Sequence, residues 1–217
     1  MPAPGGGYVP HVRFVLASAS PARLGVLRAA GIDPSVVVSG VDEDAVAASL
    51  TDPAPAELVT ALAVAKAEAV VGTVATTHTD AVVVGCDSML SIGGEMVGKP
   101  GEPNAAHKRW AQMAGGTGDL LTGHAVLRIE DGRLTRRATG SQTTTVRFAE
   151  PSTEELEAYV ATGEPLVVAG AFTLDGRGGW FVEGIDGDPS SVIGISLPLT
   201  RRLLAEVGVS VVDLWTA

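Results

Sequence analysis

The chain alternates between short apolar runs and segments whose apolar residues recur every three or four positions, a pattern typical of α/β proteins. Residues 12–17 predict a buried strand, and a helix follows it at once. Ser20 suits the N-cap of that helix, Pro21 its first position and Gly31 its left-handed stop. The first part of the chain is therefore expected to fold as strand, tight Ser-rich turn and helix.

A second pattern joins a long helix to a fully apolar strand. Residues 55–71 predict an Ala-rich amphipathic helix, with Lys66 inside its apolar stripe. Residues 81–86 predict a strand too apolar to face water, and this strand ends at Asp87. Ligand sites of open α/β sheets gather at such strand ends, so Asp87 is a candidate site residue.

The remaining pattern predicts a mixed arrangement of helices and strands. The expected elements are a strand at 36–38, a hairpin closed by Gly93 and Gly94, a helix over 104–114, antiparallel strands within 120–148, a helix opened by a capping box at Ser152, short strands within 170–187 and a helix from Pro198. This order gives an α/β fold with a mixed twisted sheet flanked by helices. We expect one domain over residues 12–217, preceded by a flexible tail at 1–11.

Composition and charge exclude several classes of partner. The net charge of −10 argues against nucleic-acid binding, which relies on clustered Lys and Arg. No uninterrupted apolar run approaches the roughly 20 residues of a membrane crossing, so no membrane partner is expected. The single cysteine and the lack of a signal-like N-terminus favour the cytoplasm.

Several catalytic motifs are absent or incomplete. The chain has no G-x-S-x-G, no H-E-x-x-H and no Cys/His pair at zinc spacing. The segment from Gly93 to Lys99 matches a phosphate-binding P-loop until Pro100 replaces the required Ser or Thr. Since its glycines also fit a hairpin, we expect Lys99 to act, if it reaches a phosphate, from a different scaffold.

Acidic residues provide the second candidate feature. Read alone, Asp87 could cap a turn with Ser88, and the acidic run at 42–44 could be a solvated loop. Read together, they supply the carboxylate oxygens that Mg²⁺ prefers. A hydrolytic metal site is then a workable hypothesis.

Basic and hydroxyl side chains have two interpretations as well. The aliphatic part of the Lys66 side chain could pack on apolar surface while its ammonium group reaches water. Alternatively, the ammonium group could face a bound polyanion. Ser18 and Ser20 could be plain caps, or form an anion site with Arg23 at the N-terminus of the first helix.

Seven short strings in the same order resemble the Maf family of nucleotide pyrophosphatases. They are 16–23 (LASASPAR), 41–43 (VDE), 85–88 (GCDS), 98–100 (GKP), 162–165 (TGEP), 169–172 (AGAF) and 185–188 (IDGD). Each string is weak by itself, but all seven fall in order between about residues 13 and 207.

The resemblance implies a two-lobed fold similar to the inosine triphosphate pyrophosphatases, and hydrolysis of a nucleoside triphosphate to the monophosphate and pyrophosphate with Mg²⁺ or Mn²⁺. It implies that Asp87 is the general base and Glu43 its acidic partner at the metal. The triphosphate-binding group it implies is Ser18, Ser20, Arg23, Lys66 and Lys99. By analogy alone, it also suggests a homodimer.

Three positions depart from the thymidine and uridine triphosphate branch of the family. Ala22 stands where a second arginine is usual, Ser88 where threonine is usual and Asp175 where glutamine is usual. These positions resemble substrate determinants, so the preferred base, including modified bases, stays open.

Two other functions are compatible with the resemblance. One is a non-catalytic, nucleotide-sensing interaction protein that restrains septum formation in cell division. The other is a nucleotide-sugar or phosphosugar enzyme. The joint presence of Glu43, Lys66, Asp87 and Lys99 favours the hydrolase, because buried uncompensated charges destabilise a pure scaffold.

Overall fold

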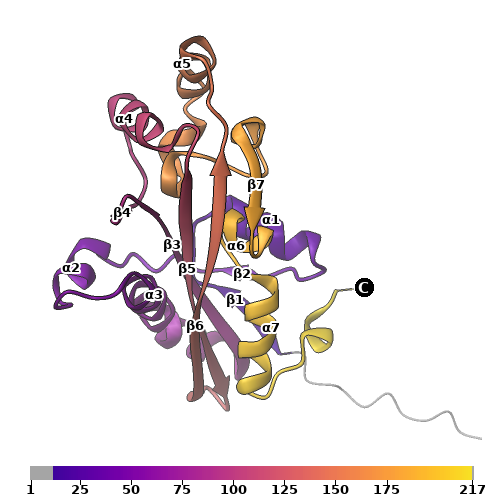
Figure 1. Cartoon of the computed structure of the whole chain (residues 1–217). Helices are drawn as coiled ribbons and strands as arrows, with labels where there is room; N and C mark the ends of the chain where they lie inside the picture. The colour runs from indigo at the N-terminus through magenta and orange to yellow at the C-terminus, as the bar shows by residue number, and fades with distance from the viewer. Residues whose placement is uncertain (1–11, 217) are drawn as a thin grey trace, which may run out of the picture.

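The computed structural model describes residues 12–216, so the expected tail at 1–11 lies outside the described residues. One curled, mixed sheet runs through the molecule (Figure 1). Its strands are β1 Arg13–Leu16, β2 Ser35–Val36, β3 Asp80–Ile92, β4 Glu95–Val97, β5 Thr117–Glu130, β6 Arg133–Phe148 and β7 Val182–Asp186. The order across the sheet is β2-β1-β3-β5-β6-β7, and β4 pairs with the end of β3. The predicted mixed α/β sheet is therefore confirmed.

Helices cover both faces of this sheet. They are α1 Pro21–Ala29, α2 Glu43–Ala48, α3 Pro55–Thr77, α4 Pro103–Met113, α5 Thr153–Ala161, α6 Pro189–Ile193 and α7 Leu197–Glu206, with short 3-10 turns η1 Glu164–Val167, η2 Ala169–Ala171, η3 Arg177–Phe181 and η4 Val211–Leu214. In Figure 1, α3 lies on one side of β5 and β6 and α7 on the other, while α4 and α5 lie at the far end of the long strands.

Three apolar clusters hold these layers together. The α7 core packs residues such as Leu203 against Val84 of β3. The α3 core packs residues such as Ala67 against Val83 on the opposite face. The α4 core contains four buried aromatic side chains, those of Trp110, Phe148, Tyr159 and Phe172.

Helix α3 lies directly on the backbone of the sheet. A Cβ atom added to Gly85 would stand 2.3 Å from the carbonyl oxygen of Ala63, and one added to Gly123 would stand 2.1 Å from that of Val59. Both distances are far below van der Waals contact, so only glycine permits this approach. The two glycines lie on neighbouring strands, β3 and β5, and define the surface on which α3 rests.

The extent of α3 corrects one expectation. It runs to Thr77, beyond the predicted end at residue 71, and by length and composition it is long and apolar enough to cross a membrane. A criterion based on uninterrupted apolar runs misses this helix, because single polar residues interrupt it. In the structure its buried face includes Val59, Ala63 and Val70, which pack in the core. Packing on the sheet accounts for this buried face.

Strand β3 is longer than predicted, so Asp87 does not end a strand. β3 continues to Ile92 because β5 pairs with it throughout, with Asp87 opposite Gly123. The parallel partner β1, however, pairs with β3 only as far as Val84. Asp87 therefore lies just beyond the end of the parallel strand β1, where β1 no longer pairs with β3.

Two further expectations change and several are confirmed. The acidic run is not a loop: Asp42 accepts a hydrogen bond from the backbone of Ala45 and caps α2. The segment 170–187 contains the end of η2, the whole of η3 and irregular chain, and it contributes one strand, β7. The glycine hairpin between β3 and β4, the caps of α1 and α5 and the antiparallel pairing of β5 with β6 are confirmed.

Candidate functional site

The first part of the candidate site is an ion-pair cluster built from three elements. Lys66 extends from α3, and its Nζ atom lies 2.5 Å from Asp87 Oδ1 and 2.8 Å from Glu43 Oε1. Asp87 and Lys66 are buried, whereas 54% of the Glu43 side chain is exposed. The structure thus brings the two predicted acidic residues together across a lysine ammonium group.

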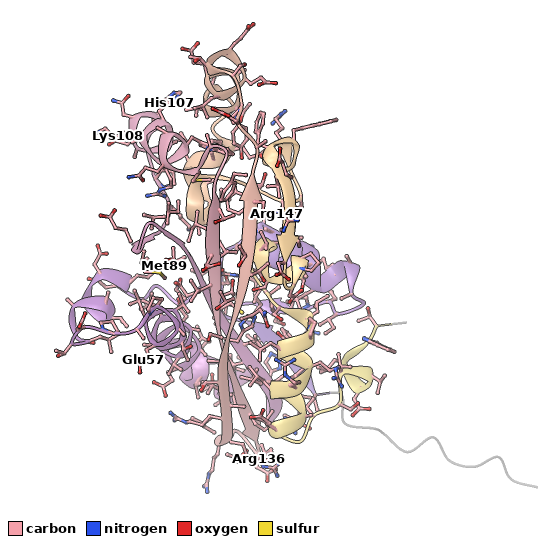
Figure 2. All side chains as sticks on the ribbon, in the orientation of Figure 1. Glu57, Met89, His107, Lys108, Arg136 and Arg147 are labelled. Atoms are coloured by element: carbon pink, nitrogen blue, oxygen red, sulfur yellow. The ribbon has the colours of Figure 1, made fainter. Side chains whose placement is uncertain are left out.

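The fold positions each member of this cluster. The close contact of α3 with Gly85 and Gly123 places Lys66 over β3, one residue from Ala67, which touches Gly85. Asp42 begins α2, so Glu43 occupies its first turn. Met89, two residues beyond Asp87, lies on the same face of β3; in Figure 2 it lies on the side of the sheet that carries α3 and β4.

The second part lies on the opposite face of β3 and centres on Arg23. Its Nη1 donates to Ser18 Oγ at 3.0 Å, its Nη2 to Ser88 Oγ at 3.2 Å and its Nε to the Gly194 carbonyl at 2.8 Å. Ser88 Oγ lies 3.0 Å from Thr122 Oγ1. The guanidinium group is therefore surrounded by neutral oxygen atoms, and within residues 12–216 no carboxylate lies within ion-pair distance of it.

The turn before α1 is preorganised around the same group. Ser20 is the N-cap, since its hydroxyl accepts from the backbone of Arg23 at 3.4 Å. Ser18, which is buried, accepts from the backbone of Ser20 at 3.2 Å. Helix N-termini with free N–H groups attract anions, and here an arginine from the first turn adds a full charge.

Two predicted residues stand apart from both clusters. Lys99 and Asp175 are exposed, and within the described part of the chain their side chains make no hydrogen bond or ion pair with the other predicted site residues. The carbonyl of Gly98, next to Lys99, accepts bonds from Gly170 at 3.2 Å and from Arg109. The lysine thus extends from a tethered loop.

The loop that carries Asp175 is anchored by a residue that is absent from the predicted site. Glu164 accepts from Thr173 Oγ1 at 2.6 Å and from the Gly178 backbone at 3.0 Å, on either side of Asp175. Burial alone would raise the pKa of Glu164, but these hydrogen bonds outweigh it and lower the pKa below its usual value. Its place in the string TGEP was the available signal.

Two buried titratable groups are neutral. Burial raises the pKa of the Cys86 thiol to about 12, so this residue beside Asp87 is no nucleophile at neutral pH. Burial also lowers the pKa of His124 to about 4. The His124 Nε2 accepts from the Ser196 backbone at 2.8 Å, so the proton is on Nδ1, which lies 3.1 Å from the Thr122 carbonyl.

The donor set of the first cluster fits a hard divalent cation in part. Asp87 and Glu43 supply carboxylate oxygens and already hold one cation, the Lys66 ammonium, between them. Among residues 12–216 there is no group of three or more His, Cys, Asp or Glu side chains that could hold a metal ion. Mg²⁺ or Mn²⁺ would therefore complete its ligand shell with water and substrate phosphates, as is usual for Mg²⁺.

A surface hollow of about 840 Å³ lies elsewhere, beside α3. Its lining includes Leu50, Thr60 and Ser141, and it includes none of the predicted site residues. The position of the candidate site therefore rests on the two charged clusters.

Comparison with known proteins places the chain in a family. Residues 13–207 match the family model of the Maf-like protein. The chain is 71% identical over 205 residues to the nucleoside triphosphate pyrophosphatase of Saccharopolyspora erythraea, an alignment that covers 94% of this chain and 97% of that relative.

Other relatives agree along nearly the whole length. The protein of the same name from Rhodococcus erythropolis is 66% identical over 205 residues, covering 94% of this chain and 96% of the relative. The one from Mycolicibacterium gilvum is 58% identical over 206 residues, covering 94% and 99%. The chain belongs to the Maf family.

Proposed function

We propose that this chain, a nucleoside triphosphate pyrophosphatase by its family and relatives, acts at the Glu43–Lys66–Asp87 cluster by metal-assisted attack of water on a nucleoside triphosphate. The products would be the monophosphate and pyrophosphate. The observation that carries the proposal is the cluster itself. Three residues from α2, α3 and β3 meet within 2.8 Å contacts, and two of them are buried charges.

Asp87 is proposed as the general base. Its carboxylate is buried and oriented by Lys66, which prevents it from rotating away from a water molecule held in the site. Glu43 is half exposed, so its carboxylate can exchange partners between the ammonium and an incoming ligand. A divalent cation, when bound, would lower the pKa of water and neutralise phosphate charge.

The Arg23 cluster is proposed as the grip for the phosphate chain. An arginine has five N–H donors, and three of those of Arg23 go to neutral oxygens. Within the described part of the chain, two donors and the whole positive charge remain for an anion. Ser18 and Ser20 would assist through the α1 N-terminus, and Lys99 would approach from its tethered loop.

We further propose that base preference depends on Ala22, Ser88 and Asp175. Ser88 is in direct contact with Arg23, and Asp175 lies on the loop that Glu164 anchors. The two-lobed shape similar to the inosine triphosphate pyrophosphatases is part of the same proposal.

The decisive test is pyrophosphate release from each common and several modified nucleoside triphosphates, with Mg²⁺, with Mn²⁺ and with a chelator. We expect metal-dependent release of pyrophosphate and monophosphate in equal amounts from at least one triphosphate. Release of single phosphates would point to a different bond cleavage. Nucleotide binding without turnover under all conditions would overturn the enzymatic proposal in favour of a nucleotide sensor.

A further inference from the structure

The orientation of Arg23 depends on a chain of hydrogen bonds whose direction can be deduced. Thr122 Oγ1 donates its one proton to the carbonyl of Ser191 at 3.0 Å, because a carbonyl can only accept. Thr122 can then only accept in its contact with Ser88 Oγ at 3.0 Å. The Ser88 hydroxyl therefore points at Thr122, and its lone pairs face Arg23 Nη2.

Both ends of this hydrogen-bond chain are fixed. Thr122 lies in β5 opposite Ser88 in the register of the sheet and has no exposed surface. Ser191 belongs to α6, and the next residues bring the Gly194 carbonyl to Arg23 Nε. The side chain of Thr122 thus joins β3, β5 and the α6 segment around one guanidinium group.

We propose that Thr122 is a positioning residue for phosphate binding: its hydroxyl orients Ser88 so that Ser88 accepts from Arg23 and leaves the two remaining guanidinium donors facing the substrate. This inference rests on the proposed function of Arg23. If Ser88 instead turned its proton toward Arg23, a hydroxyl dipole would oppose the guanidinium charge, and the arginine would lose one of its three anchors.

The test separates the hydroxyl from the shape of the side chain. Thr122→Val keeps the volume and removes the hydroxyl, whereas Thr122→Ser keeps the hydroxyl. The probe is inorganic tripolyphosphate, which carries the phosphate chain without a base, measured by calorimetry on the full-length protein. We expect Thr122→Val to bind it about 3- to 10-fold more weakly, the effect of one net hydrogen bond, and Thr122→Ser to bind it like the unchanged protein.

Kinetics on an accepted nucleotide give a second measurement. We expect Thr122→Val to raise KM by a similar factor and to change kcat by less than about twofold, because Arg23 would hold the phosphates equally in the ground and transition states. In a Ser88→Ala background, Thr122→Val should have little further effect, since the intermediate hydroxyl is already gone.

Thr200→Val is the matched control. Thr200 is also buried, but its hydroxyl has no hydrogen-bond partner among residues 12–216. It should leave tripolyphosphate binding unchanged. Thermal unfolding of every variant ensures that binding is measured on folded protein.

Four outcomes would overturn the inference: equal binding by Thr122→Val and the unchanged protein, equal weakening by Thr122→Ser, full additivity with Ser88→Ala, or no tripolyphosphate binding by the unchanged protein. Tripolyphosphate binding that behaves as expected, without pyrophosphate release from any nucleotide, would instead overturn the proposed function alone.

Discussion

The two cations of the candidate site, Arg23 and Lys66, lie on opposite faces of β3 and differ in their surroundings. Lys66 is held between two carboxylates, so its charge is compensated within the protein. Arg23 is held by two hydroxyls and a carbonyl, so its charge is not. Both are fixed in position, but only Arg23 keeps a full charge available for an anion.

This difference suggests a division of labour. A cation fixed by neutral oxygens is preorganised to bind phosphate without first losing a partner. A cation fixed by carboxylates instead keeps two buried or half-buried acids in place and would have to share them with a divalent metal. Four experiments test this division, and they follow in decreasing order of the change that each should produce.

Asp87→Asn should have the strongest consequence. If Asp87 is the general base, turnover should fall by about 100-fold or more, while Arg23 still binds the phosphates. Pyrophosphate release and nucleotide calorimetry on the same preparation measure both quantities. Asp213→Asn makes the same charge change in the exposed turn η4 and should leave turnover intact. Near-normal turnover of Asp87→Asn would remove this residue from the mechanism.

His124 should make the Arg23 side of the sheet sensitive to acid. Its pKa is lowered to about 4 chiefly by burial; the Thr122 hydrogen bond opposes this shift, the charge of Arg23 adds to it and that of Asp188 opposes it. An unfolded histidine titrates near 6.5, so the unfolded state binds more protons between pH 6.5 and 4. Stability should therefore decline as pH falls through this window, by roughly 3 kcal/mol in total.

Denaturant unfolding at several pH values measures this decline. His124→Gln should remove the histidine contribution, whereas His107→Gln should not, because His107 lies on the outer part of α4 (Figure 2). The same pH slope in both variants would show that the buried imidazole is not its source.

Gly123→Ala tests the contact that places Lys66. The added methyl group would stand 2.1 Å from the Val59 carbonyl and displace α3 from the sheet. Overpacking of this kind costs about 1 to 3 kcal/mol, and the displacement should also lengthen the contact of Lys66 with Asp87 and lower turnover. Gly72→Ala, also in α3, should be neutral or stabilising, because a Cβ added there would meet no other atom of residues 12–216 within 4 Å. A Gly123→Ala protein as stable and active as the original would show that the glycine contact does not position Lys66.

The weakest effect is expected in metal affinity without nucleotide. Lys66→Met removes a competing charge from the Asp87 and Glu43 carboxylates, so Mn²⁺ should bind several-fold more tightly, because the repulsion between the ammonium group and the divalent ion is lost. Arg23→Met should leave this affinity unchanged. Electron paramagnetic resonance of free Mn²⁺ measures both. Equal Mn²⁺ affinities of the unchanged protein, Lys66→Met and Arg23→Met would contradict the proposed difference between the two cations.

Local signals predicted local structure well. The Ser20 cap, the capping box at Ser152 and the hairpin at Gly93 and Gly94 are each encoded within a few adjacent residues, and each is confirmed. Such signals depend on backbone groups that neighbouring side chains can satisfy, so no knowledge of the rest of the fold is needed.

Long-range pairing explains the wrong strand end predicted at Asp87. The apolar run of β3 stops at Asp87 and so predicts a strand end there, but β5 pairs with every residue from Asp80 to Ser91 and carries the strand on. There tertiary contacts override the local pattern. The acidic run at 42–44 is different: Asp42 caps α2 by a local hydrogen bond, a cap signal that the interpretation as a solvated loop overlooked.

The sequence named the charged residues of both clusters, Glu43, Lys66, Asp87 and Arg23, but not how they meet. Lys66 is conspicuous inside an apolar stripe, but its partner Asp87 is 21 residues away and meets it only because α3 docks on Gly85 and Gly123. Thr122 gives no comparable signal. A threonine in a strand is ordinary, and only the register of β5 against β3 brings it to Ser88.

The long hairpin of β5 and β6 has a consequence for how the molecule melts. Leu127 at one end belongs to the α3 core, and Leu120 and Phe148 at the other end belong to the α4 core. Because β5 and β6 form one continuous ladder that reaches both cores, loss of order at one end weakens the ladder that holds the other end. The two halves should therefore unfold together as one cooperative unit.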